Sequence, residues 1–163
     1  MDSLNLEFVK DKNNILDYNQ WSCGDYEREI PYSQSTSNVT IELNDEYKIN
    51  GNYSIKLLNG QSNSWEWFQI FRYGEYSNIS KIQIKLDSIS NQKFRIYAIC
   101  LYNNTTSTTL LDYITALSAE TFQTTTLTAT VDPMQTVTGV GLRIVLTDKD
   151  TVLNMDNVSV KIL

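Results

Sequence analysis

The sequence predicts an all-β fold built as an antiparallel sandwich of two sheets. Apolar residues recur with period two in short segments, which is typical of strands with one buried face. Clusters of Asn, Ser, Thr, Asp and Gly, residues that favour turns, separate these segments. The chain has 163 residues and no Pro- or Gly-rich linker, so we expect residues 1–163 to form one domain with its core between the two sheets.

Nine or ten strands are expected, and the alternation is clearest at 39–43, 53–57, 82–86, 94–102, 127–131, 140–146 and 158–162. Residues 110–120, LLDYITALSAE, have some helical character, but their β-branched residues and missing cap favour strand plus loop. A short helical turn at 116–120 is the alternative for the end of this segment. The Thr-rich runs 105–109 and 124–126 are expected on solvated strand and loop surface, which suits Thr.

The charge balance argues against a nucleic-acid partner. The chain carries 13 Lys and Arg against 19 Asp and Glu, a formal net charge of −6, and its cations form no dense run. Phosphate backbones are bound by clustered cations that release counterions. No stretch approaches the roughly 18 apolar residues of a membrane-spanning helix, so we expect no membrane insertion.

The residue counts also argue against an enzyme. Histidine is absent, which removes the commonest general base, the usual zinc ligand and the base partner of a Ser or Cys nucleophile. The acidic clusters at 27–29, 44–46 and 148–150 single out no pair of facing carboxylates. Cys23 and Cys100 match no metal or redox spacing, and they are either two buried thiols or one disulfide.

Residues 63–73, NSWEWFQIFRY, hold five aromatic side chains in eleven residues. In a strand, alternation places Phe68 and Ile70 on a core-facing side and leaves a second side rich in rings. That second side comprises Trp65, Trp67, Gln69, Phe71 and Tyr73. Flat rings stack against sugars, and amide and Arg groups bond sugar hydroxyls. A sugar platform, a protein interface and a second layer of core all remain open interpretations.

Three short motifs follow one another along the chain: Asn5–Phe8 with Trp21 and Ser22 after it, Asn50–Leu57, and Leu153–Val160. Their order resembles that in β-jelly-roll carbohydrate-binding modules, especially the xylan- and glucan-binding group that accompanies bacterial glycoside hydrolases. The resemblance implies jelly-roll topology and noncatalytic binding of an oligosaccharide or polysaccharide. It also implies an accessory or targeting module of a larger exported or surface protein, and therefore an extracellular location.

The resemblance also suggests sugar-binding residues. In that group a Trp at the head of the strand and a Gln further along it line the cleft, and Trp65 or Trp67 with Gln69 match this pattern here. Alternation and distance along the chain add three candidates on neighbouring strands: Tyr97, Tyr102 and Arg143. Because few polar groups are desolvated in such a shallow site, the affinity should be on the order of micromolar to millimolar.

The same group commonly holds one structural calcium ion that links the first strand to the last. In this chain Asp156 matches the acid of the closing motif, and Glu7 and Asn50 are the other candidate ligands. The acid expected directly after Phe8 is replaced by Val9. Calcium takes about six to eight oxygen ligands, so backbone carbonyls would have to complete the shell.

The main alternative function is assembly or adhesion, as in a domain of a viral fibre or a cell-surface adhesin. The ring-rich side of 65–73 would then pack against another subunit in a homo-oligomer on a cell or virion surface. The Asn- and Thr-rich strands and the departure at Val9 leave this alternative open.

Overall fold

The computed structural model describes residues 14–17, 33–49, 54–60 and 65–163, and these form strands and loops without a helix. The strands are β1 (Asn14–Asp17), β2 (Ser33–Ser35), β3 (Val39–Asn44), β4 (Ser54–Asn59), β5 (Glu66–Tyr76), β6 (Lys81–Ser90), β7 (Phe94–Tyr102), β8 (Thr109–Ala116), β9 (Ala119–Thr130), β10 (Val137–Leu146) and β11 (Thr151–Ile162). Within these ranges no helix is available to cross a membrane. The all-β prediction is confirmed.

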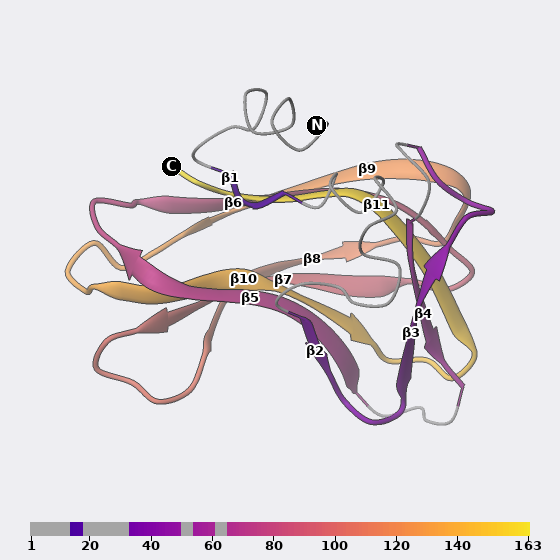
Figure 1. Cartoon of the computed structure of the whole chain (residues 1–163), viewed down its shortest axis with the longest axis horizontal. Helices are drawn as coiled ribbons and strands as arrows, with labels where there is room; N and C mark the ends of the chain where they lie inside the picture. Colours follow the sequence, from indigo (N-terminus) through magenta and orange to yellow (C-terminus); the bar gives the residue numbers. More distant parts are fainter. Residues whose placement is uncertain (1–13, 18–32, 50–53, 61–64) are drawn as a thin grey trace, which may run out of the picture.

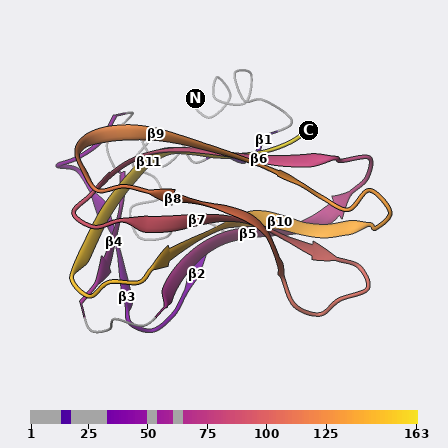
Figure 2. The same cartoon turned by 180° about the vertical axis from the view of Figure 1, so that it is seen from behind.

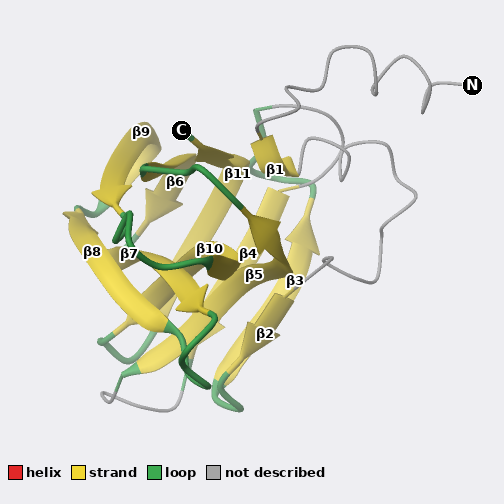
Figure 3. Cartoon of the chain, turned by 90° about the vertical axis from the view of Figure 1, so that its left-hand side faces the viewer, coloured by secondary structure: helices red, strands yellow, loops and turns green. Residues whose placement is uncertain are grey.

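The strands form two antiparallel sheets that face each other as separate layers (Figure 1; Figure 2). One sheet has the order β3-β4-β11-β6-β9, and β1 also pairs with β11 beyond the end of β4. The other has the order β2-β5-β10-β7-β8, with β2 and β8 at its two edges (Figure 3). Consecutive strands such as β5 and β6, or β10 and β11, belong to different sheets. This alternation between layers agrees with the predicted jelly-roll sandwich.

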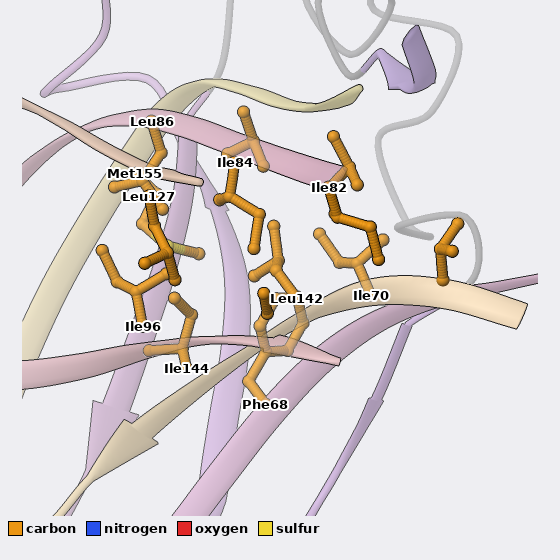
Figure 4. Packing of buried hydrophobic residues seen from close by; sticks show 14 of the residues in the cluster. Phe68, Ile70, Ile82, Ile84, Leu86, Ile96, Leu127, Leu142, Ile144 and Met155 are labelled. Carbon is orange, nitrogen blue, oxygen red and sulfur yellow. The ribbon is translucent and has the colours of Figure 1, made fainter. Parts of the chain in front are cut away.

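The hydrophobic core fills the space between the two sheets. On β5, Phe68 and Ile70 are fully buried there, which confirms the predicted inward side of that strand. They meet alternating apolar side chains of both layers: Ile82, Ile84 and Leu86 of β6, Ile96 of β7, Leu127 of β9, Leu142 and Ile144 of β10 and Met155 of β11 (Figure 4). Burial of apolar side chains from both sheets is the largest contribution to the stability of a β-sandwich.

The described residues form eleven strands where nine or ten were expected, and the structure also departs from the sequence prediction in two segments. Residues 116–120 do not form a helical turn, because β9 begins at Ala119, where it pairs with Ser90 of β6. β11 begins at Thr151, well before the predicted start at 158. Its alternation is interrupted by a bulge between Asp156 and Ser159, where Asn157 has a φ of 52°, and a bulge hides the period-two pattern.

Of the two cysteines, only Cys100 lies within the described residues. Cys100 is a free, fully buried thiol on the core side of β7, as one of the two sequence interpretations expected. Cys23 lies outside the described residues, as do the first motif at 5–8, Trp21 and Ser22.

Candidate functional site

The outer face of the five-stranded sheet carries a row of five polar and aromatic side chains, one from each strand. Directly opposed residues of adjacent antiparallel strands point to the same face. The register pairs Gln34 with Gln69, Gln69 with Arg143, Arg143 with Tyr97, and Tyr97 with Tyr113. We call this the central row. Residues far apart in the sequence are thereby aligned across the sheet.

Hydrogen bonds lock the polar half of the central row. Arg143 donates from Nε (3.1 Å) and Nη2 (2.9 Å) to the same atom, Oε1 of Gln69. Gln69 in turn donates from Nε2 to Oε1 of Gln34 at 3.2 Å, and Arg143 Nη2 reaches Oγ1 of Thr108 at 3.2 Å. Burial lowers the pKa of the Arg143 guanidinium from its ordinary value, because the charged form loses part of its hydration. The site therefore holds a partly desolvated cation in a fixed orientation.

Trp67 lies in the neighbouring row, which runs Trp67, Val145, Arg95 and Thr115 across β5, β10, β7 and β8. The guanidinium carbon of Arg143 lies 4.8 Å from the centroid of the Trp67 ring. A planar cation over an indole face is a favourable cation–π arrangement. One face of Trp67 is therefore covered by Arg143.

Arg95 forms a second stack near the other edge of the sheet. Its guanidinium carbon lies 4.9 Å from the Trp65 ring and 5.1 Å from the Tyr113 ring. Nη1 also donates to the hydroxyl of Tyr97 at 3.3 Å, and this hydrogen bond is the main reason that the pKa of Arg95 is raised. Trp65 itself remains 55% exposed, so its ring is accessible to a partner.

A smaller apolar cluster runs across the central row, from the row of Trp67 to the row of Phe71. It comprises Phe71, Tyr97, Ile99 and Val145, with Trp67 and Leu101 packed against it. The Phe71 ring lies directly over Gly139, because the outward positions of β10 beside it are the glycines Gly139 and Gly141. A Cβ on Gly139 would overlap the Phe71 ring, and a Cβ on Gly141 would overlap the backbone of Ile70. The missing side chains at these glycines therefore leave room for the Phe71 ring and for the close approach of β10 to β5.

Five of the six predicted sugar-binding residues come together on this face: Trp65, Trp67, Gln69, Tyr97 and Arg143. Tyr102 does not, because it lies in the core between the sheets, where its hydroxyl accepts the N–H of Asp132 at 2.9 Å. Five residues separate Tyr97 from Tyr102 along one strand, and an odd separation places side chains on opposite faces. The expectation for Tyr102 was therefore wrong.

Sequence reasoning missed four residues of this face: Gln34, Arg95, Thr108 and Tyr113. Arg95 was predictable from the sequence, since it lies two residues from Tyr97 on the same strand and so shares its face. Gln34 sits in a strand of three residues, which is too short to show alternation. Thr108 precedes β8, where no periodicity marks it.

Asp156, the predicted calcium ligand, is buried on the six-stranded sheet. Its Oδ2 accepts the N–H of Ile49 (2.6 Å), and its Oδ1 accepts the N–H of Asn157 (2.8 Å). The cross-strand partner Asp87 accepts the side-chain amide of Asn157 at 2.6 Å. In the described part of the chain no three acidic, Cys or His side chains gather around a common point. Glu7 and Asn50 lie outside it, so the calcium site stays a prediction.

Comparison with protein-family models gives no match, and neither does comparison with curated proteins. Solved structures match in fold. A CBM22 xylan-binding domain from Paenibacillus barcinonensis is 11% identical, with a TM-score of 0.60 over 94% of this chain and 97% of that domain.

Two longer proteins contain a similar fold. An exo-β-agarase matches at 11% identity and a TM-score of 0.63, over 93% of this chain and 25% of the agarase. The enzymatically active domain of tailspike protein 4 from bacteriophage CBA120 matches at 13% identity and a TM-score of 0.60, over 80% of this chain and 19% of the tailspike chain. At these identities the likeness concerns the fold, and the chain resembles the β-sandwich carbohydrate-binding modules.

Proposed function

We propose that the chain binds an oligosaccharide or polysaccharide noncatalytically on the outer face of its five-stranded sheet. The central row carries this proposal: Gln69 and Arg143 are held by mutual hydrogen bonds beside exposed or half-buried rings. Sugar binding needs ring faces for stacking and fixed polar groups for hydroxyls. Similarity in fold to a xylan-binding domain supports the same reading.

The mechanism is preorganised stacking combined with oriented hydrogen bonding. Trp65 offers an accessible ring at one side of the face, and Tyr73, 71% exposed, offers another at the Phe71 flank. Gln69 and Arg143 lie between these rings and orient the bound chain. Because these groups are already fixed, little side-chain entropy is lost on binding. The open face still desolvates few polar groups, so we expect dissociation constants on the order of micromolar to millimolar.

We propose binding without catalysis because the three described rows at the centre of this face hold no pair of carboxyl groups. A glycosidase needs two carboxyl groups roughly 5 to 10 Å apart on either side of the scissile bond. The central row and the rows of Trp67 and Phe71 beside it contain no Asp or Glu from any of the described strands. The role would be that of an accessory or targeting module in a larger exported or surface protein.

Affinity electrophoresis through gels containing soluble polysaccharides tests this proposal. Wild-type protein should be retarded by at least one polysaccharide, and Trp65→Ala, which removes a 55% exposed ring, should remove most of that retardation. Tyr47→Ala is a matched control, since Tyr47 is also an exposed ring but lies in the loop after β3, away from the face. Equal retardation of wild type and Trp65→Ala would contradict the proposal, and thermal melting would show that each variant is folded.

The similarity to part of a phage tailspike favours one alternative, an assembly or adhesion domain of a fibre or surface protein. In that case Trp65 and Tyr73 would be buried against another subunit. Light scattering separates the two functions: a stable homo-oligomer that protects these rings from solvent quenchers would favour assembly, whereas a monomer with quenchable rings favours the glycan face.

A further inference from the structure

The only ionised side chains in the three rows of this face are two arginines. The row of Trp67 contributes Arg95, the central row contributes Arg143, and the row of Phe71, Gly141, Ile99 and Leu110 contributes none. The chain as a whole has six more acidic than basic residues. These three rows, with two cations and no carboxylate, therefore locally reverse the overall charge.

Neither arginine is neutralised by the described residues around it. Arg143 is held by an amide oxygen and a hydroxyl, and burial alone shifts its pKa. Arg95 is held by a tyrosine hydroxyl and two rings, with Tyr97 and Tyr113 as its electrostatic neighbours. Uncharged acceptors orient a guanidinium but leave its full positive charge in place. A partly buried cation of this kind gains more from an anionic ligand than an exposed one does.

Both arginines also keep unused donors. The contacts of Arg143 involve Nε and Nη2, and Nη1 has no acceptor in the described part of the chain. Arg95 uses Nη1, and among the described residues its Nε and Nη2 have no acceptor. Stacking on rings occupies the flat side of a guanidinium and leaves its N–H edge open. The Nε–Nη2 edge of Arg95 fits a carboxylate or a sulfate through two parallel hydrogen bonds, and Nη1 of Arg143 can donate to one oxygen of such a group.

The two arginine–indole stacks also change which ligands can contact the indole rings. Arg143 covers one face of Trp67, and Arg95 lies over Trp65. A sugar that approaches from the covered side of either ring meets the guanidinium before it meets the indole. Neutral sugars would gain hydroxyl hydrogen bonds there, but an acidic sugar would also neutralise the charge.

We infer that the ligand of this face is an anionic glycan, a polysaccharide whose sugars bear carboxylate or sulfate groups. The inference rests on the proposed function and specifies its ligand class. Arg95 and Arg143 each bind one acidic substituent, while the exposed rings and Gln69 contact the sugar rings. The net negative charge of the chain repels a polyanion at long range, but at about 0.15 M salt this repulsion is screened beyond roughly 8 Å. Contact pairs at the face are screened much less.

Isothermal titration calorimetry with matched polymer pairs tests this inference at about 0.15 M salt. The carboxylate pair is polygalacturonate and its carboxyl-reduced product, and the sulfate pair is κ-carrageenan and its desulfated product. Neutral xylan and mixed-linkage β-glucan complete the panel. Wild type should bind one acidic polymer at least about tenfold more tightly than its neutral counterpart, the size expected for one charge-assisted contact. The pair that shows this ratio identifies carboxylate or sulfate.

Variants locate the effect on the face. Arg95→Gln and Arg143→Gln should each reduce the acidic-to-neutral affinity ratio by about tenfold. Lys85→Gln removes one positive charge from an exposed position of β6 in the other sheet, and it should leave the ratio unchanged. A thermal melt confirms folding, and two independent arginine variants protect the test against one local distortion.

The outcomes distinguish the inference from the proposed function. If wild type binds acidic and neutral polymers equally and Trp65→Ala abolishes both, the proposed function stands and the anionic ligand is overturned. Binding to neutral xylan or β-glucan alone would likewise support the proposed function and overturn the anionic ligand. If no polymer of the panel binds, both are rejected. A preference that Lys85→Gln removes as completely as Arg143→Gln would show general charge attraction and also overturn the inference.

Discussion

Gln69 and Arg143 oppose each other across the β5–β10 ladder, and a single amide oxygen of Gln69 accepts two N–H groups of the same guanidinium. The geometry resembles that of a side-on salt bridge, yet the acceptor carries no charge. Gln69 is 6% exposed, so water contributes little to this contact. The pair therefore fixes the direction of Arg143 without compensating its charge, so the charge stays available to an anionic ligand.

The first prediction exchanges this amide for an acid. Gln69→Glu would give Arg143 an ionised partner of nearly the same shape, and the face would lose about one unit of positive charge. Because the desolvation and attraction of a buried ion pair nearly cancel, the melting temperature should change little. Affinity for the preferred acidic polymer should fall at least about tenfold. Titration calorimetry measures the affinity, and undiminished binding would contradict the assigned role of the Arg143 charge.

A second prediction concerns the close approach of β10 to β5. Gly141→Ala would place a methyl group against the backbone of Ile70, which side-chain rotation cannot relieve. Overpacking of this kind should lower the free energy of unfolding by about 1–3 kcal/mol. Gly60→Ala is the control, since no atom lies within 4 Å of its added Cβ. Urea denaturation compares the two variants, and equal midpoints would show that the sheet accommodates the methyl group.

A third prediction follows from two buried acids of β7. Burial raises the pKa of the Cys100 thiol and of the Tyr102 phenol, since the ionised forms lose hydration. Above their ordinary pKa values, about 8.5 and about 10, only the unfolded chain releases these protons readily. The unfolded state then binds fewer protons than the folded state, so the free energy of unfolding decreases as pH rises through this window.

Urea titrations between about pH 7 and pH 11 check this sign. The denaturation midpoint should be steady near neutral pH and should fall above about pH 8.5. Cys100→Ala should remove the earlier part of the decline relative to its own value at pH 7. If that variant declines as early and as steeply as wild type, the thiol is not the group responsible.

The fourth prediction tests the calcium expectation. If Asp156 binds Ca²⁺ with Glu7 and Asn50, millimolar CaCl₂ should raise the melting temperature, and a chelator should reverse the increase. Asp156→Asn should abolish the increase. It should also lower stability without calcium, because its carboxylate accepts the N–H groups of Ile49 and Asn157. An identical melting temperature with calcium and with chelator would reject the ion and leave Asp156 as a structural acceptor.

Period-two alternation predicted the inward and outward sides of β5 even though both sides carry rings. On β5 it assigned Phe68 and Ile70 to the core and Trp67 and Gln69 to the outer face, as the structure has them. It failed at Asn157, because a residue with positive φ at a bulge interrupts the period. The strand β11 therefore extends further toward the N-terminus than its sequence pattern indicates.

The relations across strands could not be read from the sequence. Gln34 faces Gln69, and Tyr97 faces Arg143, only because of the order β2-β5-β10-β7 and its register. Strand order depends on which pairings bury the most surface over the whole fold, and no local pattern encodes that choice. Arg95 shows the consequence: its strand was predicted, but the rings of Trp65 and Tyr113 on either side of it were not.

The central row shares its strands with the core, and this limits how the face can evolve. On β10, Arg143 points outward while Leu142 and Ile144 on either side of it are buried between the sheets. Insertion or deletion of one residue upstream in this strand would exchange the two sets, directing the guanidinium inward and leucine outward. New ligand preferences can therefore arise by substitution at outward positions, or in loops such as the one that holds Thr108, whereas changes in strand length would remove the core together with the site.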